Sequence, residues 1–344
     1  MPSFLIIEAE ALKGVKPGRG ARGKNLEDFL KTYYGSKSVS MTSVNKLSGQ
    51  ISYCTDHLFI GIPSSITKSD LKKISFKKLH LFDYGDNKGI IWGQSDKEFL
   101  CSITKSYLKT WTQNNWGEEF NWGTLPIRRN RSLALSVKWN NLFNRAHNLS
   151  RIRPTDTTFL GNPVVNWKEN FSSVLKNTRV QWLEEISAQE KYSFSGGFFM
   201  RNEEAKELKE QAPDSLKPFF LEKGRLNFFS YFNLMLNSKT ALTPPGNALW
   251  SYRHYESLYA GTIPITGCFR NTEMLIPLPL SGMIHLGEGE SIIHGIEKAL
   301  KMRNDRPNVT CDNLDFIECY LSNGLYDRRK KRLIARFMKQ IERN

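Results

Sequence analysis

Apolar runs and amphipathic stretches alternate along the first half of the chain. The run SFLIIEA at 3–9 predicts a buried first strand, because its apolar residues end in a polar, glycine-rich stretch. A helical pattern follows at 26–33, and apolar runs at 57–62 and 79–82 flank a short helical segment at 68–74. Alternating strands and helices are typical of parallel sheets covered by helices. The pattern therefore predicts a doubly wound first domain.

The second half repeats this alternation. Helical patterns near 168–188, 202–210 and 226–237 alternate with strand patterns near 192–195 and 239–243. No repeat of fixed period connects the halves, so their similarity is architectural. The sequence predicts a second doubly wound sheet and, with it, an α/β protein.

The length of the chain suits two domains better than one ordinary core. Pro154 and a Gly-Asn-Pro turn punctuate the segment RIRPTDTTFLGNP, which places the expected boundary between an N-terminal domain, 1–153, and a C-terminal domain, 154–326. Residues 327–344 are expected to form a last helix that docks back across the domains. Its apolar stripe consists of Ile334, Phe337, Met338 and Ile341.

Composition limits the partners and the compartment. The 49 Lys and Arg exceed the 34 Asp and Glu by 15, which favours polyanionic partners, a diphosphate-bearing donor or simply solubility. The basic runs at 127–131 and 327–332 are nucleic-acid contacts or solvated surface. Five cysteines without a C-x-x-C pair argue against a disulfide framework and a zinc site. No apolar run approaches the roughly 18–20 residues of a membrane span. We therefore expect a soluble cytoplasmic protein, in the host cytoplasm if the source is viral.

One segment combines a turn, a helix and charge in an order suited to binding an anion. A strand is expected to end near Thr243, followed by a Pro-Pro-Gly turn and a helix from about 247–248 to Gly261. The N–H groups at such a helix start favour a diphosphate. Arg253 and Glu256 share a helix face, so one can neutralise phosphate while the other accepts hydrogen bonds from a ribose diol. Taken alone, an R-x-x-E pair is more often an intrahelical ion pair.

The residues around this pair carry a family resemblance. The stretch SKTALTPPGN at 238–247 and the stretch RHYESLYAGTIPI at 253–265 resemble the donor-binding segment of exostosin-like glycosyltransferases. FLG at 159–161, followed by Arg179, is similar to the family's earlier strand and arginine helix. The resemblance implies a GT-B fold, with two doubly wound Rossmann-like domains facing a cleft, and a nucleotide-sugar donor, first of all a UDP-sugar. It implies no further cofactor and no obligatory metal, in agreement with the absence of a D-x-D motif.

The resemblance also assigns roles to residues. Arg253 is implied to contact the donor phosphates and Glu256 the ribose, while Gly246 lets the backbone approach the donor closely. The other donor-binding residues expected are Pro245, Asn247, Ser251, Tyr252, Arg179 and Gly161.

The acceptor is indicated by charge and by a second resemblance. The helical arrangement resembles, less extensively, the phage DNA β-glucosyltransferases, and the positive charge then points to a polyanionic acceptor such as hydroxymethylated DNA. A surface or capsular glycan is the alternative acceptor, and a non-catalytic nucleic-acid-binding protein on a transferase fold is the alternative of another class. Acceptor or phosphate contacts are expected from Arg19 and Arg22 in the glycine-rich loop and from Arg128, Arg129 and Arg131.

An inverting transfer requires a group that takes the proton of the acceptor hydroxyl. We expect this base in the first domain, where Asp83 and Asp86 follow a predicted strand in HLFDYGDN and loop residues of a parallel sheet face the crevice. Either aspartate also suits a structural turn. His57, His80 and His254 are rival bases or packed histidines.

Overall fold

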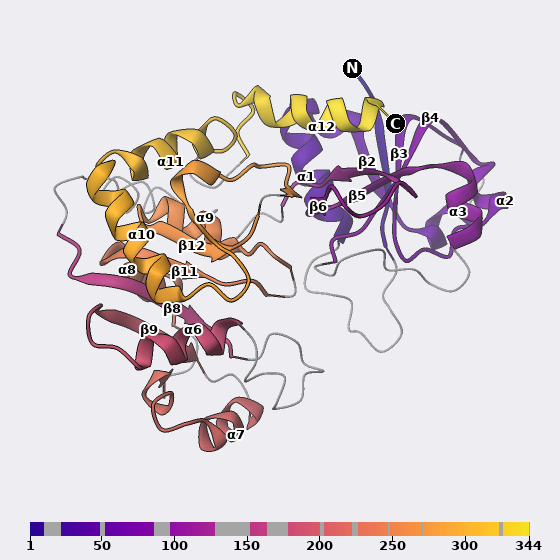
Figure 1. The fold of residues 1–344 in the computed structure, drawn as a ribbon. Coiled ribbons are helices and arrows are strands. Elements are labelled where there is room, and N and C mark those ends of the chain that lie inside the picture. Colours follow the sequence, from indigo (N-terminus) through magenta and orange to yellow (C-terminus); the bar gives the residue numbers. More distant parts are fainter. Residues whose placement is uncertain are drawn as a thin grey trace. The chain divides into compact units, whose positions relative to one another are not determined.

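The computed structural model describes residues 1–9, 22–48, 52–85, 97–127, 152–163, 178–199, 203–221, 226–246, 248–269, 271–322 and 326–343. Two compact units form (Figure 1). The first unit contains Met1–Arg129, Asn271–Pro277 and Cys319–Asn344, and the second contains Asn130–Arg270 and Leu278–Glu318. The sequence predicts continuous domains, whereas each compact unit combines separate segments.

The first unit contains a six-stranded parallel sheet of order β2-β1-β3-β4-β5-β7. Its strands are β1 (Phe4–Ile7), β2 (Val39–Thr42), β3 (Tyr53–Gly61), β4 (Ile74–Phe82), β5 (Ser106–Lys109) and β7 (Asn121–Thr124). A small antiparallel pair joins β6 (Thr112–Gln113) to β13 (Thr272–Glu273). Its helices are α1 (Arg22–Tyr34), α2 (Lys68–Leu71), α3 (Lys97–Ile103) and α12 (Lys331–Arg343), with 3-10 turns at Ser36–Ser38 and Val44–Ser48.

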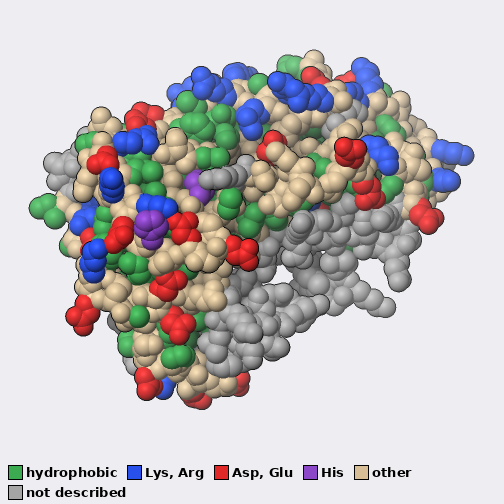
Figure 2. Space-filling model, in the orientation of Figure 1, with side chains coloured by type: hydrophobic (Ala, Val, Ile, Leu, Met, Phe, Trp, Pro, Cys, Tyr) green, Lys and Arg blue, Asp and Glu red, His purple; other side chains and the backbone are tan. Residues whose placement is uncertain are grey.

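The last helix belongs to the first unit. Phe337 of α12 packs its ring 5.3 Å from Phe29 of α1 and 6.2 Å from Phe59 of β3. Ile334 and Ile341 of the predicted stripe are also buried, because the apolar face of an amphipathic helix is removed from water when it docks. The opposite face is basic, and Figure 2 shows Lys and Arg side chains gathered where α12 lies. Its exposed cations are Lys331, Arg332, Arg336, Lys339 and Arg343.

The second unit contains another six-stranded parallel sheet, of order β10-β9-β8-β11-β12-β14. Its strands are β8 (Thr155–Gly161), β9 (Phe194–Phe199), β10 (Phe220–Leu221), β11 (Ser238–Thr243), β12 (Ile263–Gly267) and β14 (Ile284–Leu286). Its helices are α6 (Thr178–Ser187), α7 (Glu203–Gln211), α8 (Phe228–Leu236), α9 (Tyr252–Tyr259), α10 (Ile292–Asp305) and α11 (Val309–Glu318), with 3-10 turns at Lys217–Phe219 and Leu280–Gly282.

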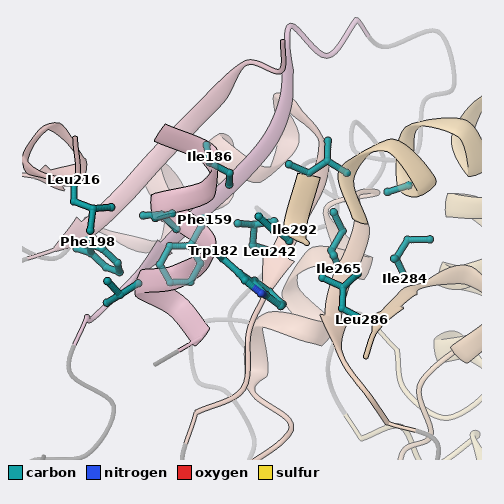
Figure 3. Close-up of a cluster of buried hydrophobic side chains, with 14 of the residues drawn as sticks. Phe159, Trp182, Ile186, Phe198, Leu216, Leu242, Ile265, Ile284, Leu286 and Ile292 are labelled. Carbon is teal, nitrogen blue, oxygen red and sulfur yellow. The ribbon is translucent and has the colours of Figure 1, made fainter. Parts of the chain in front are cut away.

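The core of the second unit lies between its sheet and two helices (Figure 3). Phe159, Leu242 and Ile265 point from β8, β11 and β12 toward Trp182 of α6 and Ile292 of α10. Buried strands of a parallel sheet are apolar on both faces, which is why the sequence shows them as continuous apolar runs. The expected α/β class, with two doubly wound sheets as in the GT-B fold, is confirmed.

The order of strands locates one reversal of winding in each sheet. In the second unit the chain winds outward from β8 through β9 to β10, then returns to the other side of β8 with β11 and continues outward through β12. In the first unit the corresponding reversal lies between β1 and β3. Ligands of doubly wound proteins bind beyond the carboxyl ends of the strands at such a switch point.

Candidate functional site

Two arginines lie at the switch point of the second unit. Nη2 of Arg253, in α9, donates to the carbonyl oxygen of Leu160 at 2.7 Å, and Nη1 of Arg179, in α6, donates to that of Asn162 at 2.9 Å. Both acceptors are at the carboxyl end of β8, which pairs with β11. The structure thus brings together two arginines that lie in different helices and are 74 positions apart in the sequence. Each guanidinium has five N–H donors, so both can hold an anion as well as the backbone.

Glycines leave room for these guanidinium groups. A Cβ on Gly246, just after β11, would stand 2.9 Å from Nη2 of Arg179. A Cβ on Gly161, at the end of β8, would stand 3.0 Å from Nη2 of Arg253 and 2.7 Å from Cζ of Phe159. Four of the expected donor-binding residues, Arg179, Arg253, Gly161 and Gly246, therefore lie close together.

Arg253 is held by an aromatic ring as well as by the backbone. Its guanidinium carbon lies 4.8 Å from the centre of the Phe159 ring, a distance suited to a cation–π contact. Its Nε is buried and has no hydrogen-bond acceptor among the residues that the structure describes. A buried N–H without an acceptor costs free energy that an anionic ligand would recover.

Glu256 is buried in α9 and bonded to a tyrosine of another helix. The carboxylate is 8% exposed, and its Oε2 accepts a hydrogen bond from the hydroxyl of Tyr231, in α8, at 2.8 Å. Burial, followed by the charge of Glu256, raises the pKa of Tyr231, so the hydroxyl stays protonated. Within the described part of the chain no ion pair joins Glu256 to Arg253, and the intrahelical pair that the sequence left open is not formed.

Helix α9 begins later than the sequence predicts. It starts at Tyr252, after a turn in which the Gly246 N–H donates to the Ala248 carbonyl at 2.9 Å. The N–H of Ser251 donates to Nδ1 of His254 at 3.0 Å, and Nε2 of His254 lies 2.9 Å from Oγ1 of Thr266. The predicted start at 247–248 was wrong, because the buried histidine caps the helix at Ser251.

The remaining expected donor residues lie around this turn. Pro245 is half-buried, and Tyr252 packs its ring 5.3 Å from Trp250. Asn247 lies outside the described residues. These placements leave the roles of Pro245, Ser251 and Tyr252 as predictions.

Asp83 is locked in a buried ion pair. Its carboxylate is 0% exposed and accepts from Nζ of Lys109 at 2.9 and 3.0 Å and from the Tyr107 hydroxyl at 2.7 Å. The backbone N–H of Gly85 donates to it at 2.7 Å. These contacts speak against the predicted role as general base, because each oxygen already accepts bonds. Asp86 lies outside the described residues.

The candidate histidines are packed side chains. Nδ1 of His80 lies 2.8 Å from the Ser106 hydroxyl, and its Nε2 lies 3.2 Å from Nδ1 of His57. Burial lowers the pKa of His80 to about 3, and burial likewise lowers the pKa of His254 to about 3. Both are neutral at physiological pH.

Glu8 is a carboxylate that the sequence reasoning missed. It follows β1 at the switch point of the first unit, and its N–H donates to the Thr42 carbonyl at 3.0 Å. Its Oε1 is buried and has no hydrogen-bond partner among the described residues. Burial, with the charge of Glu27, raises the pKa of Glu8. The signal was present in the sequence, since the first apolar run ends directly at Glu8.

Several other expectations cannot be placed. Arg19, Arg128, Arg129 and Arg131 lie outside the described residues, and only the backbone of Arg22 is described, at the start of α1. Over the described ranges, no three His, Cys, Asp or Glu residues are grouped as a metal site. No helix in those ranges has both the length and the apolar character to cross a membrane.

Comparisons with known proteins give distant likenesses. No family model and no curated protein matches the chain. It is similar to Anabaena Alr3699/HepE in complex with UDP, at 11% identity and a TM-score of 0.49 over 98% of this chain and 99% of that chain. It is also similar to AviGT4, a glycosyltransferase involved in avilamycin A biosynthesis, at 10% identity and a TM-score of 0.48. That likeness covers 99% of this chain and 97% of AviGT4. A chain of the GtfA/B complex is similar at 11% identity and a TM-score of 0.43. The likeness covers 87% of the present chain but only 59% of the GtfA/B chain. Scores below 0.5 do not extend these likenesses to a site.

Proposed function

We propose that the second unit binds a nucleotide-sugar and that the protein transfers the sugar to a hydroxyl acceptor. The observation that carries the proposal is the convergence of Arg179 and Arg253 at the carboxyl ends of β8 and β11. Two guanidinium groups at a switch point suit a ligand with two adjacent phosphates. Glu256, in the same helix as Arg253, supplies a buried carboxylate for the ribose hydroxyls.

The same groups suit the chemistry of sugar transfer. As the bond between the anomeric carbon and the diphosphate breaks, negative charge grows on the leaving phosphate, and fixed cations stabilise it. Arg179 and Arg253 can supply this charge, which supports a metal-independent reaction. A UDP-sugar is the first donor to examine, as the resemblance of residues 238–265 implies.

Glu8 is the carboxylate that we assign to the acceptor proton, in place of Asp83. A general base needs an oxygen that is open to a proton and a pKa near the working range. Oε1 of Glu8 has no partner among the described residues and the pKa of Glu8 is raised, whereas both oxygens of Asp83 are bonded to Lys109. In an inverting transfer, Glu8 would take the hydroxyl proton as the acceptor oxygen bonds to the anomeric carbon.

A polyanionic acceptor is supported by the basic face of α12. Lys331, Arg332, Lys339 and Arg343 are exposed along it, and these four make no ion pair with any described residue. Cations without local partners attract phosphates and release counterions on binding. Hydroxymethylated DNA combines such phosphates with a hydroxyl acceptor, and a surface or capsular glycan is the competing acceptor.

The experiment measures donor binding before transfer. We expect one of the UDP-, GDP-, dTDP- and ADP-sugars to raise the melting temperature of the wild type and of Arg306→Met but not of Arg253→Met. Arg306 is the matched control, because its Nη1 donates to the Ser281 carbonyl at 2.8 Å elsewhere in the same unit. Mass spectrometry then follows sugar transfer to hydroxymethylated DNA, unmodified DNA and glycans, with and without EDTA. No shift with any nucleotide-sugar would overturn the proposal, and a shift without transfer to DNA would move the acceptor to glycans.

A further inference from the structure

Tyr231 holds one of the two charged residues of the candidate donor site. Its hydroxyl donates to Oε2 of Glu256 at 2.8 Å. The tyrosine comes from α8, whereas both charged residues come from α9. The hydroxyl has a single O–H to donate, and donating it to the carboxylate fixes the direction of one carboxylate oxygen.

This hydrogen bond replaces the contact that the spacing of the charges would otherwise favour. An arginine and a glutamate three residues apart on a helix usually pair with each other. Here Nη2 of Arg253 instead binds the Leu160 carbonyl, and the described residues show no ion pair between Arg253 and Glu256. A direct pair would neutralise both charges and occupy the groups that a nucleotide needs.

Burial makes the hydrogen bond between Tyr231 and Glu256 costly to lose. Glu256 is 8% exposed, so removing a donor from its carboxylate leaves a charge that water reaches poorly. The carboxylate would then turn toward the nearest remaining donors, among which Arg253 is one turn away in the same helix.

We propose that Tyr231 is a positioning residue that keeps Glu256 and Arg253 apart, so that the carboxylate is set for the ribose hydroxyls and the guanidinium for phosphate. The inference rests on the proposed function. It goes beyond it by assigning the choice of a ribonucleotide over a deoxynucleotide to a tyrosine that does not itself need to touch the ligand.

The test measures a ratio of affinities. The probes are the tightest binder among UDP, GDP and ADP and the 2′,3′-dideoxy form of the same nucleotide, with calorimetry giving both Kd values. We expect the wild type to prefer the ribonucleotide and Tyr231→Phe to reduce this preference about tenfold, the usual scale for a hydrogen bond to a charged group. Tyr192→Phe is the matched control, because the Tyr192 hydroxyl donates to Oε1 of Glu297 at 3.0 Å in the same unit. Its ratio should equal that of the wild type.

A double-mutant cycle separates positioning from simple loss of stability. Glu256→Gln should itself reduce the preference, and adding Tyr231→Phe to it should reduce the preference no further, since the tyrosine acts through the carboxylate. Equal preference in wild type and Tyr231→Phe, or additive losses in the double variant, would overturn the inference. If Tyr231→Phe does not fold, the Glu256→Gln variant is sufficient by itself. An unchanged preference for the ribonucleotide in that variant would overturn the inference. A wild type that binds none of the nucleotides refutes the proposed function instead.

Discussion

The switch points of the two sheets carry groups of opposite charge. In the second unit, Arg179 and Arg253 are fixed at the end of β8 by backbone carbonyls, and their remaining donors can meet an anion. In the first unit, Glu8 follows β1, and among the described residues the charge that raises the pKa of Glu8 is that of another carboxylate, Glu27. Lys24 and Lys31 bind Glu27 rather than Glu8.

This difference shows how one architecture can present different groups at the same kind of strand edge. The parallel sheet only sets where the strand ends meet, and the local partners decide what the edge can do. Cations anchored to carbonyls hold an anion, whereas a desolvated carboxylate without a cation holds a proton more readily. Asp83 makes the contrast within the first unit, because Lys109 bonds to both oxygens of its carboxylate.

The largest effect should follow from Glu8→Gln. If Glu8 takes the acceptor proton, turnover at saturating donor should fall by about 10²–10⁴-fold. Donor affinity should stay within about twofold, because the proposed donor contacts are residues of the second unit. Nucleoside diphosphate release gives the rate, and calorimetry gives the Kd. Asp70→Asn, which removes the charge of a half-buried carboxylate elsewhere in the same unit, is the control.

The pH profile distinguishes a base from a merely structural carboxylate. The raised pKa of Glu8 means that the wild-type rate should rise with pH through a value above 4.5, as the carboxylate loses its proton. This limb should be missing in Glu8→Gln. A Glu8→Gln variant that keeps the wild-type rate and pH profile would show that Glu8 takes no part in the reaction. The two switch points would then have no separate chemical roles.

A smaller effect concerns a feature that the units share, a fully buried histidine. His80 in the first unit and His254 in the second both have a pKa lowered from 6.5 to about 3 by burial. Between these values the unfolded chain binds protons that the folded chain does not, so stability is full above pH 6.5 and falls as the pH drops toward 3. Each histidine should lower the free energy of unfolding by about 2 kcal/mol at pH 5 relative to pH 7.

Urea unfolding at both pH values checks this expectation in each unit. Asn can replace the Nδ1 contact of either histidine, with Ser106 for His80 and with Ser251 for His254. The free energy of unfolding of His80→Asn and of His254→Asn should therefore fall less between pH 7 and pH 5 than that of the wild type. If it falls as much in both variants, groups other than these histidines cause the acid sensitivity.

The sequence predicts the two sheets well and the site only in part. Continuous apolar runs such as 57–62 locate buried parallel strands, because both faces of such strands are covered. Local turn chemistry also indicated the helix after Gly246, but its start depends on the contact of His254 with Thr266, which no local pattern reveals.

The features of the candidate site that could not be predicted from the sequence depend on contacts between residues far apart in the chain. Asp83 does follow a strand as predicted, yet its partner Lys109, which bonds to both oxygens of its carboxylate, is 26 positions away. Tyr231 lies 25 positions from Glu256, in a helix whose pattern looks like ordinary packing. Glu8 could have been found by the rule that selected Asp83, but its burial and its unpartnered oxygen belong to the folded chain.

The smallest effect should come from adding a methyl group at each switch point. In Gly161→Ala the new Cβ would stand 2.7 Å from the Phe159 ring and 3.0 Å from Arg253, so both must shift and nucleotide affinity should fall about tenfold. In Gly61→Ala the Cβ would stand 2.4 Å from the backbone N of Ala9, next to Glu8, and turnover should fall while affinity changes less than about twofold. Melting temperatures show whether each variant is folded, and calorimetry with steady-state rates gives the two responses. An affinity loss in Gly61→Ala as large as in Gly161→Ala would contradict the separation of an anion-binding edge from a proton-accepting one, because the same methyl group would then disturb donor binding from either sheet.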